Sequence, residues 1–232
     1  VLVFRPWGLM GRPQGASRNS APIEAPLRPG SPQFKLLAMG VFILLAVLPL
    51  LSGWLPYATV LTQDVLVAVL FAVSLHFIMG PGGMHSFGHA AYYGLGAYGA
   101  AVLLKAATMP MPLAMALAPL IAGAGALVFG WFCVRLSGVY LAMLTLAFSQ
   151  IVWSVVFQWD DFTGGSNGMI GVWPSSWLDA TSYYYLTLAL VGLSVFLLRR
   201  ILFAPFGYAL RAGRDSALRA DAIGIDVKRV QW

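Results

Sequence analysis

The chain alternates long apolar stretches with short polar links, and this pattern predicts membrane-spanning helices. A transmembrane helix needs about 20 mostly apolar residues to cross roughly 30 Å of hydrocarbon. Several stretches reach that length. The pattern predicts an all-α polytopic membrane protein with about six transmembrane helices, which cover about Leu36–Leu55, Thr59–Met79, Phe87–Lys105, Pro112–Phe132, Gly138–Phe157 and Tyr183–Phe203.

The scarcity of charge inside these stretches bears on how any transport would be driven. Hydrophobic residues make up 59% of the chain and charged residues 9%. Asp64 lies within about one turn of its helix start, where it reaches the interface or complements the helix dipole. Ion-coupled carriers usually place ionisable groups near the bilayer midplane, and none is predicted there. The energy for active transport is therefore expected to enter from outside the bilayer.

The placement of Lys and Arg predicts a cytoplasmic amino terminus. Short cytoplasmic loops retain cations, and this orientation leaves Lys105 as the single outer cation. The formal net charge of +6 is then explained by inner-face retention and attraction to anionic lipid. We therefore expect the chain to interact with a lipid bilayer and not with nucleic acid. Residues 1–35 hold many Pro, Gly, Ser and Arg with little apolar periodicity, which predicts a disordered cytoplasmic tail.

A glycine-rich stretch without charge, 82–101, precedes and enters the third predicted span. In hydrocarbon, irregular backbone survives only where protein covers it or where it lines a polar cavity. An irregular backbone break at the start of this stretch, before the third span, therefore predicts a substrate path. The candidate residues that expose polar groups to a solute are Gly82, Gly83, Ser86 and His89. Close helix packing by small residues is the alternative interpretation, and both stay open.

Two histidines in this stretch raise the question of a metal site. His85 and His89 have the i, i+4 spacing that places two imidazoles on one helix face, as zinc sites require. The sequence offers no obvious third ligand, and the single cysteine, Cys133, is best explained as a small packing residue. We predict no metal site. His89 is instead expected to hydrogen-bond backbone freed by the break, with Ser86 helping.

The last long segment, 204–231, is predicted to lie in the cytoplasm. Gly213 is expected to divide it into two short helices, and Gly224 to end the second in a left-handed conformation. The spacing of Arg211, Asp215 and Arg219 suits ion pairs on an exposed face. One apolar face is approximated by Leu210, Ala217, Leu218, Ala222 and Ile225. An amphipathic connector on lipid and a docking site for a soluble motor are both open.

Three blocks of the sequence resemble the permease subunit of branched-chain amino-acid ABC transporters, the high-affinity Leu, Ile and Val uptake type. Gly83–Tyr98, GMHSFGHAAYYGLGAY, is similar to the family pattern G-Q-x-S-L-G-H-A-A-F-x-G-x-G-A-Y. Gly138–Pro174 resembles a whole span and outer loop of the family. Pro205–Val227 resembles its cytoplasmic loop that couples to the ATPase. The resemblance covers the chain from about Leu36 to its end.

The resemblance implies alternating access driven by ATP and placement in the bacterial inner (plasma) membrane. This chain would be no enzyme and hold no cofactor, because it lacks a GxxxxGK[ST] loop and ATP and Mg would bind partner subunits. The implied partners are a homologous second permease subunit, two ABC ATPase subunits and a periplasmic substrate-binding protein. The implied organisation is a transmembrane permease domain, 36–203, a cytoplasmic coupling segment, 204–231, and residue 232 as the start of a missing further span.

The resemblance also assigns two groups of site residues. The ATPase-coupling residues are Arg211, Arg214, Asp215, Ala220, Ile223 and Gly224. The loop that would face the binding protein comprises Thr163, Gly164, Gly165, Ser166, Asn167 and Gly168. Gly-Gly and Asn-Gly pairs are also common turn chemistry, so an ordinary turn is the alternative for this loop.

One departure from the family pattern, and the breadth of the pattern itself, leave the solute open. Met84 stands where the family commonly has Gln, so no hydrogen bond from this side chain to a substrate is expected. Permeases for urea and short-chain amides share much of the pattern and form the first alternative. An ion-coupled amino-acid carrier, with a site of backbone carbonyls near Gly80 to Gly83, is a second. A membrane-embedded enzyme would need more clustered ionisable groups than His85 and His89 supply.

Overall fold

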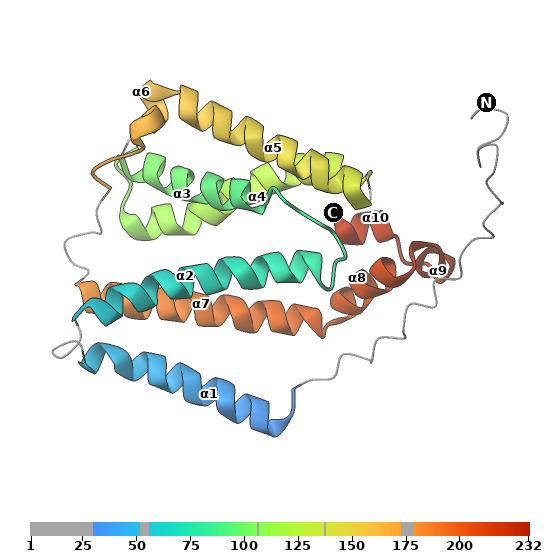
Figure 1. Ribbon diagram of the computed structural model, residues 1–232, viewed down its shortest axis with the longest axis horizontal. Coiled ribbons are helices and arrows are strands. Elements are labelled where there is room, and N and C mark those ends of the chain that lie inside the picture. Colours follow the sequence, from blue (N-terminus) through green and yellow to red (C-terminus); the bar gives the residue numbers. More distant parts are fainter. Residues whose placement is uncertain (1–29, 52–55, 106, 137, 173–178) are drawn as a thin grey trace, which may run out of the picture. The chain divides into compact units, whose positions relative to one another are not determined.

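The computed structural model describes residues 30–51, 56–105, 107–136, 138–172 and 179–232. The chain divides into two units, 1–36 and 37–232. In the first unit the described residues hold only the start of a helix, so most of the predicted tail lies outside them. The described residues contain helices and no strand. Figure 1 shows the helices of the second unit.

Five helices are long and apolar enough to cross a membrane, within the described part of the chain: α1 with η1, α2, α4, α5 and α7. The predicted third span is shorter than expected, because α3 has 17 residues and reaches only about 26 Å at 1.5 Å per residue. The all-α polytopic membrane fold is confirmed. The helices are α1 (Pro32–Val47), η1 (Leu48–Leu51), α2 (Pro56–Met79), α3 (His89–Lys105), α4 (Met111–Cys133), α5 (Gly138–Gln158), α6 (Asp160–Thr163), η2 (Gly165–Asn167), α7 (Ala180–Leu202), α8 (Pro205–Asp215), α9 (Ala217–Ala222) and α10 (Val227–Gln231).

Helices α2 and α7 pack together around a cluster of buried side chains, formed by Leu66, Tyr184, Leu188 and Val191. Tyr184 is fully buried, and its hydroxyl donates to the carbonyl of Leu45 at 2.8 Å. That carbonyl belongs to the last turn of α1, where helix carbonyls lack partners within the helix. The tyrosine thus joins α7 to the end of α1.

Replacement of Tyr184 by phenylalanine should lower thermal stability in detergent. The change leaves the part-buried Leu45 carbonyl without its donor, and a typical hydrogen bond contributes about 0.5–1.5 kcal/mol. Tyr185 provides the matched control because its hydroxyl donates to the next carbonyl, that of Ala46, from an exposed position. A melting temperature for Tyr184→Phe equal to that of Tyr185→Phe would contradict this assignment.

Small residues bring α3 and α4 close together, as the small-residue interpretation predicts. A Cβ on Gly96 would lie 3.6 Å from the Cβ of Ala122, and one on Gly99 would lie 2.9 Å from Cδ1 of Ile121. In a bilayer, helices associate through such close packing rather than through a hydrophobic driving force.

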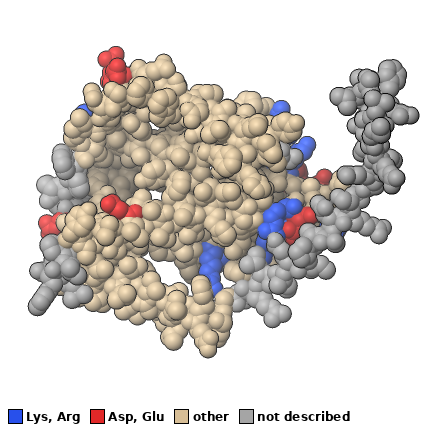
Figure 2. All heavy atoms as spheres, in the orientation of Figure 1, with Lys and Arg blue, Asp and Glu red and all other residues tan. Residues whose placement is uncertain are grey.

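On the face drawn in Figure 2, a broad area with little Lys, Arg, Asp or Glu lies between the charged groups. Basic groups are found mainly toward the end where Figure 1 shows α8, α9 and α10. Such separation suits helices that cross a bilayer. The predicted cytoplasmic location of this end remains a prediction.

Candidate functional site

The glycine-rich break, residues 80–88, contains no helix and runs back alongside α2. Its backbone amides satisfy the end of that helix: Gly80, Gly82 and Met84 donate to the carbonyls of His76, Phe77 and Ile78. His89, the first residue of α3, lies with its Nε2 2.8 Å from the Ser74 hydroxyl. Ser74 precedes the end of α2 by five residues, or about 7.5 Å of helix. The third helix therefore begins beside the interior of α2.

The end of the break is seated on α5. The Phe87 amide donates to the Thr145 hydroxyl at 3.1 Å, and this hydroxyl donates to the Ala142 carbonyl at 2.9 Å. A Cβ on Gly88 would lie 2.9 Å from the Thr145 carbonyl carbon and still closer to its oxygen. Only glycine permits this approach of two backbones. Thr145 was not among the sequence-predicted site residues, although its polar side chain in the middle of an apolar run was a signal.

A cavity of about 350 Å³ lies beside this contact. Ser86 and His89, two of the four predicted path residues, line it together with Met84 and Thr145. The other lining residues are Ile78, Tyr92, Ala122, Gly123, Ala126, Gly130, Cys133, Val134, Leu141, Gln231 and Trp232. We refer to it below as the inner cavity. Its lining is mostly apolar, with a few polar side chains at the break.

A second cavity of about 710 Å³ shares His89, Tyr92 and Ala122 with the first. His89 and Tyr92 therefore border both. The Nδ1 atom of His89 is buried and has no hydrogen-bond partner among the described residues, whereas Nε2 contacts Ser74. The histidine thus contacts Ser74 rather than freed backbone.

The other two predicted path residues, Gly82 and Gly83, are not lining residues of either cavity. A Cβ on Gly82 would collide with the Ile78 carbonyl. Gly83 has φ of +63°, a left-handed conformation that favours glycine, and lies against the side chain of Arg214. His85 is exposed. No cluster of three potential metal ligands is found within the described residues.

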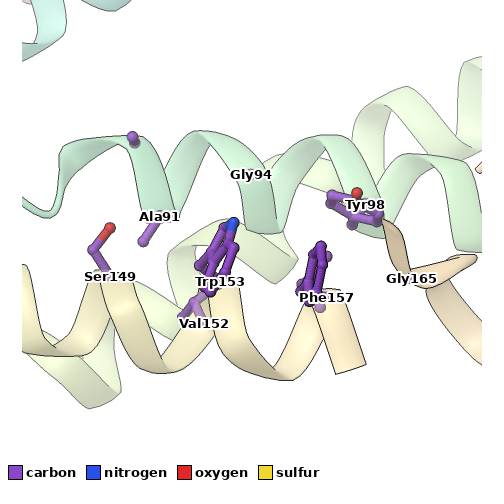
Figure 3. A pocket seen from close by; sticks show the side chains of 10 residues that line it. Ala91, Gly94, Tyr98, Ser149, Val152, Trp153, Phe157 and Gly165 are labelled. Carbon is purple, nitrogen blue, oxygen red and sulfur yellow. The ribbon is translucent and has the colours of Figure 1, made fainter. Parts of the chain in front are cut away.

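The loop 163–168, which the sequence placed on the outer side, is held by hydrogen bonds from one of its own side chains. The buried Thr163 hydroxyl lies within hydrogen-bond distance of the carbonyls of Val156 and Trp159, and Gly164, Gly165 and Gly168 have positive φ. Ser166 and Asn167 are exposed. Gly165 also reaches a cavity of about 220 Å³ between α3 and α5, where Figure 3 shows Tyr98, Trp153 and Phe157.

The segment 204–231, which the sequence placed in the cytoplasm, folds differently from the prediction. α8 continues through Gly213, where the absence of a side chain admits Val227, and the helix ends at Asp215 with Ser216 as its C-cap. Ser216 caps α9 by accepting a hydrogen bond from the Arg219 amide, so three short helices replace the expected two. Gly224 ends α9 with φ of +87°, as predicted. The predicted apolar face does not form as one surface.

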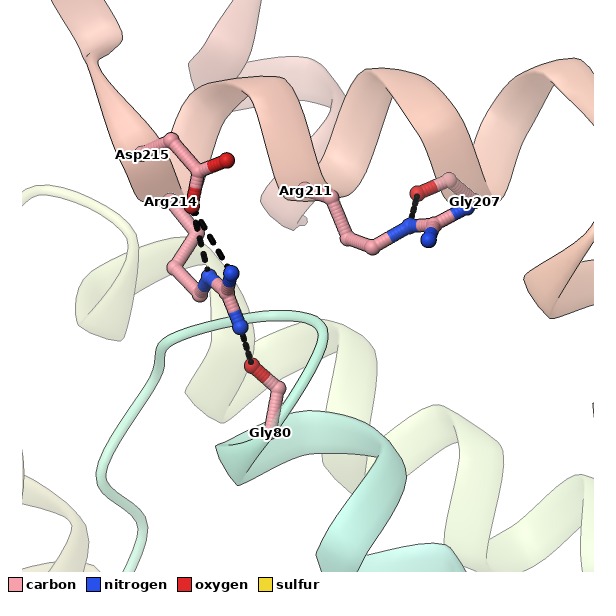
Figure 4. Close-up of polar contacts among 5 residues, drawn as sticks. All are labelled: Gly80, Gly207, Arg211, Arg214 and Asp215. Atoms are coloured by element: carbon pink, nitrogen blue, oxygen red, sulfur yellow. Dashed lines mark hydrogen bonds and ion pairs between the residues drawn. The ribbon is translucent and has the colours of Figure 1, made fainter. Parts of the chain in front are cut away.

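The predicted coupling residues separate into buried and exposed groups. Arg211 and Ala220 are buried, whereas Ile223 and Gly224 are exposed. Arg211 binds backbone carbonyls instead of pairing with Asp215, which pairs with Arg214 at 2.8 Å (Figure 4). Leu218, which the sequence placed on the buried side, is 85% exposed. Leu218 and Ile223 thus present an apolar surface on α9 and its end.

Comparison with known proteins finds a matching family and similar curated proteins. The family model described as branched-chain amino acid transport system / permease component matches residues 57–232. The chain is 27% identical over 223 residues to the high-affinity branched-chain amino acid transport system permease protein LivM of Escherichia coli K12. It is 26% identical over 230 residues to the LivM protein of Salmonella typhimurium LT2.

These alignments cover 81% and 85% of this chain and 52% of each relative. The chain thus spans about half the length of the curated relatives it matches. No solved structure matches it significantly. The family model covers most of the chain, including the break, the inner cavity and α8 to α10. The chain therefore belongs to the family of branched-chain amino acid transport permease components.

Proposed function

We propose that this chain is the membrane-spanning part of an ATP-driven importer that moves branched-chain amino acids across the bacterial inner membrane. The observation that carries the proposal is the inner cavity, which joins the glycine-rich break to the cytoplasmic segment through Gln231 and Trp232. Binding sites for small molecules are commonly about 300–1,000 Å³, mostly apolar, with a few polar groups that fix orientation. Such a site suits a small zwitterion with a branched apolar side chain.

The sequence and the exposed surface of this chain indicate which partner subunits the proposed importer needs. Its sequence has no phosphate-binding loop of the GxxxxGK[ST] type, so two separate ABC ATPase subunits would bind ATP and Mg. The exposed pair Leu218 and Ile223 offers these ATPases an apolar contact beside the charged groups of α8. A homologous second permease subunit would complete the transmembrane path.

Delivery of the solute would use a periplasmic substrate-binding protein. Ser166 and Asn167 extend from the outer loop, whose Thr163 hydrogen bonds hold the turn in shape. A loop whose turn is already held by internal hydrogen bonds has less conformational freedom to lose on binding. This supports a docking role for the loop, whereas the buried Thr163 and Gly165 would position it.

Uptake by the assembled complex in proteoliposomes tests the proposal. We expect ATP-dependent import of labelled leucine that requires the binding protein, together with competition by isoleucine and valine. Import of urea with no import of leucine would replace the proposed substrate by an amide. Sodium-dependent leucine uptake by this chain without ATPase subunits would contradict the ATP-driven mechanism.

A further inference from the structure

Two arginines on α8 each bind the carboxyl end of a different spanning helix. Arg211 donates from its second terminal nitrogen to the Leu202 carbonyl of α7 at 3.2 Å, and from Nε to Gly207 at 3.2 Å. Arg214 donates from a terminal nitrogen to the Gly80 carbonyl, directly after α2, at 3.1 Å. Carbonyls at helix ends lack intrahelical partners and attract cations. Figure 4 shows both arginines on the same helix.

The aliphatic part of Arg214 also lies directly on the break. A Cβ built on Gly83 would come within 3.1 Å of both Cβ and Cδ of Arg214, and closer to Cγ. Gly83 has φ of +63°, so the backbone turns at the point that the arginine covers. Arg214 therefore contacts the break at two positions, through a hydrogen bond at Gly80 and through packing at Gly83.

The residues after Gly83 lead into the inner cavity. Met84 donates its amide to the Ile78 carbonyl, and the side chains of Met84 and Ser86 line the cavity. The break has no helical hydrogen-bond ladder of its own. A displacement applied at Gly80 and Gly83 would thus reach the cavity lining within three residues.

The two arginines differ in what they hold. Arg211 is buried, with its guanidinium carbon 4.4 Å from the Tyr208 ring centre, and it ties α8 to the helix that immediately precedes it. The side chain of Arg214 is 26% exposed and is paired with the exposed Asp215. A partly solvated, paired cation can change its contacts at lower desolvation cost than a buried one. Arg211 is suited to act as a fixed anchor and Arg214 as a movable contact.

We propose that Arg214 is the positioning residue through which movement of the cytoplasmic segment shifts the glycine-rich break and reshapes the inner cavity. This inference rests on the proposed ATP-driven transport and adds the residue that transmits the movement. Arg214 needs no contact with the solute. Its removal should leave ATP hydrolysis in place and disconnect it from import.

The test compares Arg214→Ala with wild type in the complete complex in proteoliposomes, with two measurements. The first is solute imported per ATP hydrolysed, which should fall about tenfold or more on loss of a charge-assisted hydrogen bond. The second is hydrogen–deuterium exchange of residues 80–88 with and without ATP and vanadate. Wild type should show a nucleotide-dependent change that Arg214→Ala loses. Arg219→Ala is the matched control because Arg219 is an exposed arginine of α9.

The outcomes separate this inference from the proposed function. Absence of ATP-dependent uptake by wild type would contradict the proposed function and remove the basis of the inference. Wild-type transport with an import-to-ATP ratio for Arg214→Ala within twofold of wild type, or with a retained exchange response, would overturn the inference alone. If Arg214→Ala does not assemble, Gly83→Ala disturbs the same contact from the break, and a normal ratio for that variant would overturn it.

Discussion

The Gly88→Ala variant should be strongly destabilised and should accumulate poorly in the membrane. Gly88 is buried at the contact between the break and α5, where an added Cβ meets the backbone of Thr145. Overpacking a well-packed site costs about 1–3 kcal/mol, and the rigid helix backbone cannot move aside as a flexible side chain can. We expect the upper end of that range, together with loss of the hydrogen bond from Phe87 to Thr145.

Thermal unfolding in detergent, followed by intrinsic fluorescence, measures this effect. Gly40→Ala is the matched control, because Gly40 lies in α1 with nothing within 4 Å of an added Cβ. Alanine there should be neutral or stabilising by about 0.5–1 kcal/mol, since glycine weakens a helix interior. Equal melting temperatures for the two variants would show that the break does not depend on this backbone contact.

Hydrophobic length predicted most of the fold, because apolar stretches of about 20 residues have few alternatives to helices in a membrane. The same reasoning predicted the glycine-rich break at its correct place. It did not predict that the break runs back along α2 and shortens α3 to 17 residues. That path depends on contacts between distant residues, such as Phe87 with Thr145, which a local pattern does not encode.

Local rules also failed where tertiary contacts competed with them. Glycine usually weakens a helix, yet Gly213 lies within α8 because its lack of a side chain admits Val227. The i, i+4 spacing of Arg211 and Asp215 suggested an ion pair, but Arg211 instead donates to the Leu202 carbonyl at the end of α7, and Asp215 pairs with Arg214. The start of α9 could have been predicted from Ser216, since serine is a favoured residue at helix starts.

The candidate site was predictable in composition and only partly in geometry. Ser86 and His89 were identified as polar residues in a glycine-rich setting, and both line the inner cavity. Gly82 and Gly83 instead shape the turn beside α8, so a direct role in the path remains a prediction. Ala220 was assigned to ATPase contact from resemblance, whereas its burial indicates a role within the segment.

If the chain is part of the proposed ATP-driven importer, the Ala220→Asp variant should abolish import by unfolding the segment 204–231. Ala220 is 2% exposed, and its carbonyl accepts the Ile225 amide in the turn that closes α9. An unpaired carboxylate at such a site costs several kcal/mol. In the proposed complex, both ATP hydrolysis and solute import should fall, because the proposed ATPase subunits would lose the surface that α9 presents. This differs from the Arg214→Ala expectation, in which hydrolysis continues without import.

Ala222→Asp is the matched control, since it makes the same change at an exposed position two residues along α9. Limited proteolysis of the assembled complex reports directly on the fold of the segment. We expect rapid cleavage between 204 and 231 in Ala220→Asp and wild-type resistance in Ala222→Asp. Resistance in both, with import lost only in Ala220→Asp, would mean that Ala220 contacts the ATPase itself. In that case the buried position would have to open when the complex assembles.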